Sequence, residues 1–247
     1  MRLDLTKRVE TAVAEPGRRV LEVVAMFGLG VDASRLVDVV PATTLELNAG
    51  ELMFVTGPSG GGKSTILRLL RDELPRRGVA LIDFDALEPA ADRPVIEALA
   101  PEQPLASAMR WLSLAGLGDA FVMLRRPGEL SEGQRYRLLL ARAMAMTEAA
   151  LQRAGGKAQP GAPRVVLLAD EFAATLDRLT AKVVARNLRR WLRQVNDPAS
   201  DAGVAGVAGV AAVVATSHDD LLEALEPDVL VDKPLGEAVQ VVRRDDP

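Results

Sequence analysis

The chain has 247 residues, of which 49% are hydrophobic and 26% charged, and its formal net charge is −4. These values are typical of a globular protein with a sizeable core, and they do not indicate a bulk electrostatic grip on nucleic acid. The absence of cysteine excludes disulfides and cysteine-based zinc sites, and one histidine leaves none to spare for a Ser-His triad. The charged N-terminal stretch is unlike a signal peptide, and the longest uncharged apolar run, 203–216, is too short to span a bilayer. We therefore expect a soluble, cytoplasmic protein.

Strands and helices are predicted to alternate along the chain. Residues 1–19 are polar and are expected to be helical or loosely attached, and 20–27 fits either a strand or a helix. Short apolar or alternating runs predict strands at 43–47, 52–56, 79–84, 165–170 and 211–218, with two more near the C-terminus. Apolar residues at helical spacing predict helices at 64–74, in two pieces of 105–124, and at 132–147, 177–195 and 219–225.

The remaining segments are expected to be loops. Four prolines make 86–104 mostly loop, 153–164 is a flexible connector, and the low-complexity stretch 199–210 is a mobile loop. Strands that alternate with helices indicate an α/β fold with a mainly parallel sheet covered on both faces.

The segment GPSGGGKST matches the phosphate-loop pattern G-x-x-x-x-G-K-[ST], and it lies between a predicted strand and a predicted helix. Its glycines allow backbone N–H groups to turn toward an anion, and the helix N-terminus adds a partial positive charge. Lys63 is expected to bridge the β- and γ-phosphates, Ser64 to bind Mg²⁺ and Thr65 to bond the α-phosphate. The expected nucleotide-binding residues here are Gly57, Pro58, Ser59, Gly60, Gly61, Gly62, Lys63, Ser64 and Thr65.

An acidic pair follows the strand VVLLA. Ligands in open α/β sheets bind at the carboxyl ends of strands, where Asp170 and Glu171 are expected to lie. Asp170 is expected to hold Mg²⁺ through its water shell. Glu171 is expected to act as a general base toward the attacking water, which contributes roughly 10²–10⁴-fold in rate.

Five segments in order resemble the ATP-binding cassette (ABC) family of ATPases. They are GPSGGGKST, LSEGQ at 130–134, VVLLADEF, ATLD at 174–177 and TSH at 216–218. The resemblance covers about 20–235 and implies a P-loop NTPase fold with an antiparallel β portion near the N-terminus and a small helical lobe. It divides the chain into an N-terminal extension at 1–19, an ABC ATPase domain at 20–240 with the lobe at about 86–150, and a tail at 241–247.

The resemblance also implies roles for individual residues. Ser131, Gly133 and Gln134 match the signature element, which in the family contacts the γ-phosphate of ATP bound to the opposite subunit. Ser131 is also a favourable N-cap, so the start of its helix suits an anion. Asp177 matches the aspartate that crosses the dimer interface. His218 matches the histidine that senses the γ-phosphate and completes the catalytic set with Glu171 and Lys63.

Two expected site residues have weaker support in the sequence. An aromatic residue stacks on adenine in this family, and Phe27 is the candidate, although core packing is an equal alternative. The glutamine that approaches Mg²⁺ in the family has no clean match. Gln103 is the candidate metal-side residue, with Glu102 as an alternative, and prolines flank both.

Only 68 positions separate Lys63 from Ser131, which is shorter than in transporter cassettes. The resemblance is therefore to soluble ABC ATPases with a shortened helical subdomain. It implies a hydrolase that binds ATP and Mg²⁺ and forms an ATP-dependent, head-to-tail homodimer around two ATP molecules. We expect the dimer to drive a protein or nucleic-acid partner that the sequence does not identify.

Other functions remain open at this point. A membrane permease as partner, with the chain as the nucleotide-binding subunit of a transporter, is the alternative that the short lobe disfavours. A P-loop kinase of a small metabolite is a further alternative, in which LSEGQ is an incidental helix start. Solvated helix faces are the default explanation for basic clusters at 68–77, 125–126 and 186–193, and a nucleic-acid contact is the alternative that the negative net charge disfavours.

Overall fold

The computed structural model describes residues 1–12, 17–30, 34–88, 93–154, 161–199 and 209–244. Half of the expected connector at 153–164 and most of the low-complexity stretch at 199–210 lie outside the described residues, as does the end of the expected tail. None of the described helices has the length and apolar character that a membrane span requires.

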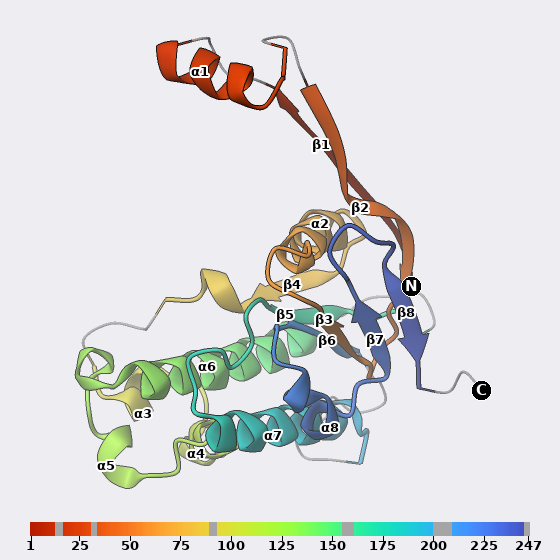
Figure 1. The fold of residues 1–247 in the computed structure, drawn as a ribbon. Helices are drawn as coiled ribbons and strands as arrows, with labels where there is room; N and C mark the ends of the chain where they lie inside the picture. Colours follow the sequence, from red (N-terminus) through yellow and green to blue (C-terminus); the bar gives the residue numbers. More distant parts are fainter. Residues whose placement is uncertain (13–16, 31–33, 89–92, 155–160, 200–208, 245–247) are drawn as a thin grey trace.

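A six-stranded sheet forms the centre of the molecule (Figure 1). Its strand order is β4-β5-β6-β3-β7-β8; the first five strands are parallel and the last pairs antiparallel with its neighbour. The expected P-loop NTPase architecture with a mainly parallel sheet is therefore present. The strands of this sheet are β3 (Leu52–Thr56), β4 (Ala80–Asp83), β5 (Val165–Ala169), β6 (Val210–Ala215), β7 (Val229–Asp232) and β8 (Gln240–Arg243).

Helices cover both faces of this sheet. Besides the longer helices, short 3₁₀ turns occur at Phe84–Ala86, Pro127–Glu129 and Asp219–Leu221. The α-helices are α1 (Arg18–Met26), α2 (Lys63–Arg76), α3 (Val95–Ala98), α4 (Leu105–Leu114), α5 (Ala120–Met123), α6 (Glu132–Arg153), α7 (Arg178–Asn196) and α8 (Leu222–Leu225).

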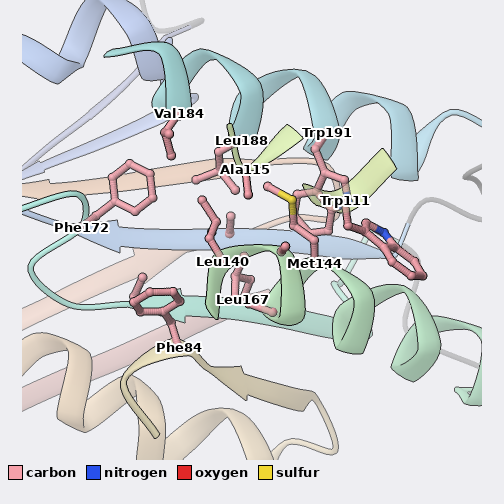
Figure 2. Packing of buried hydrophobic residues seen from close by; sticks show 14 of the residues in the cluster. Phe84, Trp111, Ala115, Leu140, Met144, Leu167, Phe172, Val184, Leu188 and Trp191 are labelled. Carbon is pink, nitrogen blue, oxygen red and sulfur yellow. The ribbon is translucent and has the colours of Figure 1, made fainter. Parts of the chain in front are cut away.

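The central strands are buried on both faces, which explains their uninterrupted apolar sequences. In β3, Leu52 and Phe54 join one hydrophobic cluster with α6 and α7, whereas Met53 and Val55 join a second cluster with α2. Figure 2 shows the first cluster, in which Trp111 of α4 and Trp191 of α7 lie beside α6. The small helical lobe of α3, α4 and α5 is thus attached to the core through α6 and α7.

The N-terminal region differs from its expected state. Instead of being helical or loosely attached, residues 2–12 form strand β1 (Arg2–Ala12), which pairs antiparallel with β2 (Ser34–Glu46). Leu3 and Leu5 pack the base of the hairpin into the α2 cluster. The charged residues around these two leucines hide the strand pattern in the sequence. The other half of the hairpin projects from the body, and α1 lies at its far end (Figure 1).

Three element ends also differ from expectation. The helix expected to stop at Pro75 continues to Arg76, because the stop is supplied by Gly78 in the left-handed conformation (φ +76°) just past the cap. The helix expected at 132–147 extends to Arg153. The expected tail begins inside β8, whose Val241 and Val242 pair with β7.

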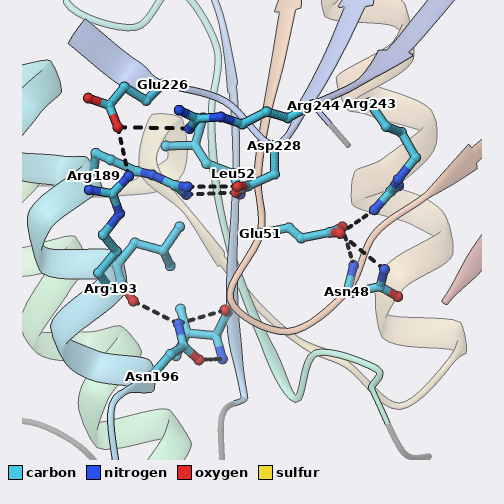
Figure 3. Close-up of polar contacts among 12 residues, drawn as sticks. Asn48, Glu51, Leu52, Arg189, Arg193, Asn196, Glu226, Asp228, Arg243 and Arg244 are labelled. Atoms are coloured by element: carbon cyan, nitrogen blue, oxygen red, sulfur yellow. Dashed lines mark hydrogen bonds and ion pairs between the residues drawn. The ribbon is translucent and has the colours of Figure 1, made fainter. Parts of the chain in front are cut away.

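Ion pairs hold the amino end of the sheet, on the side opposite the phosphate loop (Figure 3). Arg189 of α7 binds Asp228 through both terminal nitrogens, at 2.6 and 2.7 Å, and an Asp228 oxygen also accepts the Leu52 N–H at 2.7 Å. Bidentate pairing of this kind fixes orientation as well as position. Strand β3, and with it the loop that follows, is therefore tied to α7.

Candidate functional site

The glycine-rich loop connects β3 to α2 and surrounds a hollow of about 280 Å³. Gly62 is the N-cap of α2 and provides no side-chain cap, so the first N–H groups of the helix remain available to an anion. Lys63 is 4% exposed, and its Nζ donates to the carbonyls of Gly57 and Pro58 at 2.9 and 3.1 Å. The hollow is lined by Val39, Ser59, Gly60, Gly62, Lys63, Ser64, Thr65, Arg68 and Glu171.

Steric requirements explain why this loop needs glycine at two positions. Strand β7 ends beneath the loop, and the carbonyl oxygen of Lys233 would lie 2.3 Å from a Cβ at Gly57 and 2.6 Å from one at Gly61. Gly57 also has a φ of +127°, which L side chains rarely adopt. The cradle is thus a close approach of two backbone segments, and it has the shape and donors that a phosphate chain requires.

The acidic pair lies at the carboxyl end of β5, as the sequence predicts for Asp170 and Glu171. The Glu171 N–H donates to Asp170 Oδ1 at 3.0 Å, and Glu171 itself is exposed and lines the phosphate hollow. A carboxylate therefore faces the same space as the Lys63 loop. Oxygen donors from Ser64 and the acidic pair suit a hard divalent cation such as Mg²⁺.

Asp85 is a neighbour of Asp170 that sequence reasoning missed. It follows β4, which pairs with β5, and its Oδ2 accepts the Asp170 N–H at 3.0 Å. Burial raises the pKa of the Asp85 carboxyl, and the adjacent Asp83 and Asp170 charges raise it further, against the lowering effect of the Asp170 hydrogen bond. Arg71 of α2 binds Asp83 and Asp85 and balances part of this charge.

Gln103 and Phe27 are not brought to this site. Gln103 is exposed in the turn before α4, where its N–H donates to Ala100, and it does not line the hollow. The position beside Asp170 belongs to Asp85 instead. Phe27 caps α1 at the far end of the projecting hairpin and is 75% exposed, so it neither lines the hollow nor packs in the core.

His218 lies in the loop that follows β6, and β6 pairs with β3 in the central sheet. The His218 N–H donates to Thr216 Oγ1 at 3.3 Å, and the next residue, Asp219, accepts a short hydrogen bond from Thr56 at the end of β3. His218 is partly buried beside the phosphate loop, although it does not line the hollow. Sequence reasoning missed Asp219, which fixes the histidine loop to the strand that enters the phosphate loop.

The LSEGQ element forms the start of α6, and none of its residues lines the phosphate hollow of its own chain. Ser131 is the N-cap: its Oγ accepts the Gln134 N–H at 3.3 Å, and Gln134 Oε1 accepts the Ser131 N–H at 3.0 Å. This capping box satisfies two helix-end groups and leaves Ser131 exposed. Gly133 lies against Leu176, next to Asp177.

Asp177 caps α7 and is also exposed. Its Oδ1 accepts the Thr180 N–H at 3.0 Å, and hydrogen bonding from Thr180 lowers the pKa of the Asp177 carboxyl. Ser131, Gly133, Gln134 and Asp177 are thus grouped on one surface rather than around the hollow. None of these four residues lines the phosphate hollow of its own chain.

Comparisons with known proteins identify the family. A family model described as "ABC transporter" matches residues 41–151. A protein of Chlorella vulgaris named "Probable sulfate/thiosulfate import ATP-binding protein CysA" is 31% identical over 186 residues, which cover 63% of this chain and 68% of that protein. The chain belongs to the ATP-binding cassette family of ATPases.

Two bacterial cassettes extend the same relationship. "Sulfate/thiosulfate import ATP-binding protein CysA 1" of Rhizobium meliloti is 34% identical over 194 residues, which cover 66% of this chain and 48% of that protein. "Sulfate/thiosulfate import ATP-binding protein CysA 2" of Agrobacterium fabrum is 32% identical over 186 residues, covering 62% and 47%. The present ABC ATPase spans about half the length of these bacterial relatives.

Solved structures show the same fold. The dimeric ABC transporter cassette MJ0796 aligns with a TM-score of 0.56 at 20% identity, covering 86% of this chain and 93% of that chain. A post-hydrolysis state of MJ0796 bound to ADP and Pi aligns with a TM-score of 0.59 at 18% identity, covering 100% of both chains. This ABC ATPase is therefore a nucleotide-binding cassette in fold as well as in sequence.

Proposed function

We propose that this cassette hydrolyses ATP with Mg²⁺ at the hollow between the glycine loop and Glu171. The observation that carries this proposal is the presence of Glu171 together with Lys63 in the lining of the phosphate cradle. The α2 N-terminus and Lys63 bind the phosphates and stabilise charge that develops on the γ-phosphoryl oxygens. Glu171 orients the attacking water and accepts its proton, and His218 contacts the γ-phosphate from the β6 loop.

Mg²⁺, when bound with the nucleotide, neutralises phosphate charge and orients the β- and γ-oxygens. Ser64 and Asp170 are the side chains we propose to hold it, Asp170 through water. Asp85 accepts the Asp170 N–H and so fixes the backbone from which the Asp170 carboxylate extends.

The working unit is proposed to be a head-to-tail homodimer. The phosphate hollow is open to solvent, and the exposed Ser131 helix start does not line it within one chain. In a two-fold arrangement, Ser131, Gly133 and Gln134 of one copy cover the hollow of the other, and Asp177 lies at the contact. Each of the two ATP sites is then composed of both chains.

Mixing two inactive variants tests this arrangement. Glu171→Gln keeps an intact signature helix but lacks the base, and Ser131→Arg keeps the base but blocks the signature surface. In a head-to-tail dimer the mixture assembles one complete site, from the Ser131→Arg phosphate loop and the Glu171→Gln signature. We expect ATP hydrolysis to return on mixing. A Ser131→Arg variant that hydrolyses ATP alone, as a P-loop kinase or a monomeric ATPase would, contradicts the proposal.

A transporter subunit is the second candidate function. The names of the relatives, which describe ATP-binding proteins of sulfate or thiosulfate import, favour a membrane permease as partner. The short lobe of α3, α4 and α5 is the surface we propose for partner contact in either case. Copurification of an integral membrane protein with the Glu171→Gln variant from detergent extracts, and its absence with a phosphate-loop variant, supports the permease. A partner found only in the aqueous fraction supports the soluble alternative.

A further inference from the structure

The backbone that carries Glu171 is held in an unusual conformation. Glu171 and Ala173 have φ values of +44° and +57°, and neither is glycine. Side chains at such angles crowd the backbone, so this conformation persists only where the surroundings hold it. Glu171 is itself exposed, so its neighbours must supply the restraint.

Two hydrogen bonds on buried residues supply it. Phe172 is fully buried, and its N–H donates to the Ala215 carbonyl at the end of β6 at 2.7 Å. The Ala173 N–H donates to the Tyr136 hydroxyl at 2.8 Å. One restraint is therefore a backbone hydrogen bond from the loop to the end of β6, and the other is a hydrogen bond to a single side-chain oxygen from α6.

The Tyr136 ring is itself fixed by packing. Its centroid lies 4.9 Å from that of Phe84 and 6.4 Å from that of Phe172, in tilted and edge-on arrangements. Such geometries are the preferred ones for aromatic pairs. Burial raises the pKa of the Tyr136 hydroxyl, so that it stays protonated and accepts the Ala173 N–H as a neutral group.

We propose that Tyr136 is a positioning residue whose hydroxyl holds the strained loop that presents Glu171 to the phosphate hollow. The proposal rests on the proposed role of Glu171 as the base. Tyr136 lies five positions after Ser131 on α6. The same helix therefore carries the surface that covers the other copy's nucleotide and the oxygen that places this copy's base. Through its hydroxyl, Tyr136 connects the position of α6 to the conformation of the loop that carries Glu171.

The variant Tyr136→Phe tests the role, because it keeps the ring and removes only the oxygen. The Ala173 N–H is then buried without its acceptor, and the left-handed loop loses one of the hydrogen bonds that restrain it. We expect kcat for ATP hydrolysis to fall between about 5-fold and 100-fold, the range that corresponds to one unsatisfied buried group. ATP affinity should stay within about twofold, because the phosphate loop is unchanged.

Thr147→Val is the matched control. Thr147 lies on the same helix, is fully buried, and donates its hydroxyl to Ala143 at 2.7 Å, far along α6 from the loop. Its loss removes a buried hydroxyl without touching Glu171, so kcat and ATP affinity should both stay within about twofold. Amide exchange of a peptide that covers 170–176 gives a second readout without catalysis. Exchange should be faster in Tyr136→Phe and unchanged in Thr147→Val.

The outcomes separate this inference from the function on which it rests. A wild-type chain that hydrolyses ATP, with a Tyr136→Phe variant of equal kcat, overturns the role of Tyr136 alone. An equal loss of ATP affinity and of kcat, or equal exchange in both variants, overturns it as well. A wild-type chain that binds ATP but does not hydrolyse it overturns the proposed function, whatever the variant does.

Discussion

The buried carboxylate of Glu148 accepts hydrogen bonds from both tryptophan indoles of the chain. This network offers a direct test of how the helices pack. Glu148 of α6 is 6% exposed, and its Oε1 accepts from Trp111 of α4 at 2.9 Å and from Trp191 of α7 at 2.8 Å. Arg110 pairs with Oε2 at 2.5 Å and lies over the Trp111 ring. Glu148 therefore links α4 of the helical lobe to both α6 and α7.

The variant Glu148→Ala leaves two buried indole N–H groups without an acceptor. Each unpaired buried donor costs about 1–3 kcal/mol, and Arg110 adds little because its side chain is 32% exposed. For two such donors, we expect the free energy of unfolding to fall by about 2–6 kcal/mol. Glu148→Gln keeps an acceptor oxygen for the indoles and should cost only about 1–2 kcal/mol.

Urea titration followed by tryptophan fluorescence measures both variants. The chain has two tryptophans, Trp111 and Trp191, so the signal comes from the residues that lose their acceptor. Glu102→Ala, on an exposed loop, is the control and should change the free energy by no more than about 0.5 kcal/mol. Equal losses for Ala and Gln at position 148, or a loss below about 1 kcal/mol for Ala, would refute the reasoning.

Two further predictions concern the nucleotide site. Gly57→Ala places a Cβ against the Lys233 carbonyl at a residue with φ +127°, so ATP binding measured by calorimetry should weaken at least about tenfold; Gly118→Ala, which meets nothing within 4 Å, should leave it unchanged. The pKa of the Asp177 carboxyl is lowered by its hydrogen bonds from Thr180, so its stabilising effect is present above the ordinary aspartate pKa and is lost as pH falls through the lowered value. Urea midpoints between pH 6 and 2 should therefore fall less steeply for Asp177→Asn than for the wild type; parallel curves would contradict this.

The central sheet was predictable because its strands are buried on both faces. Val165–Ala169 and Leu52–Thr56 are almost entirely apolar runs that lead into the acidic pair and the glycine-rich loop, and their bounds agree closely with expectation. The phosphate loop and the acidic pair were identifiable for the same reason, since the chemistry requires them at strand ends. In these segments, the strands that the local apolar pattern predicts are the strands that lie buried in the central sheet.

The hairpin and the metal-side neighbour were not predictable in the same way. Only two side chains of β1, Leu3 and Leu5, are buried, so the strand carries almost no alternation. Phe27 lies at the far end of the hairpin, away from the phosphate loop, because of pairing between segments that are distant in the sequence. The residue type favours Gln103, whereas the carboxylate that follows β4 and accepts the Asp170 N–H is that of Asp85.

The most direct test of the proposed function is the mass of the Glu171→Gln variant in solution with ATP and Mg²⁺. One chain has a mass of 26.3 kDa. Because ATP binding without hydrolysis holds the composite sites closed, light scattering should give twice this mass with ATP and a single-chain mass when Ser131→Arg is added to the same chain. A Glu171→Gln chain that binds ATP and remains a monomer at micromolar concentration would contradict the head-to-tail dimer.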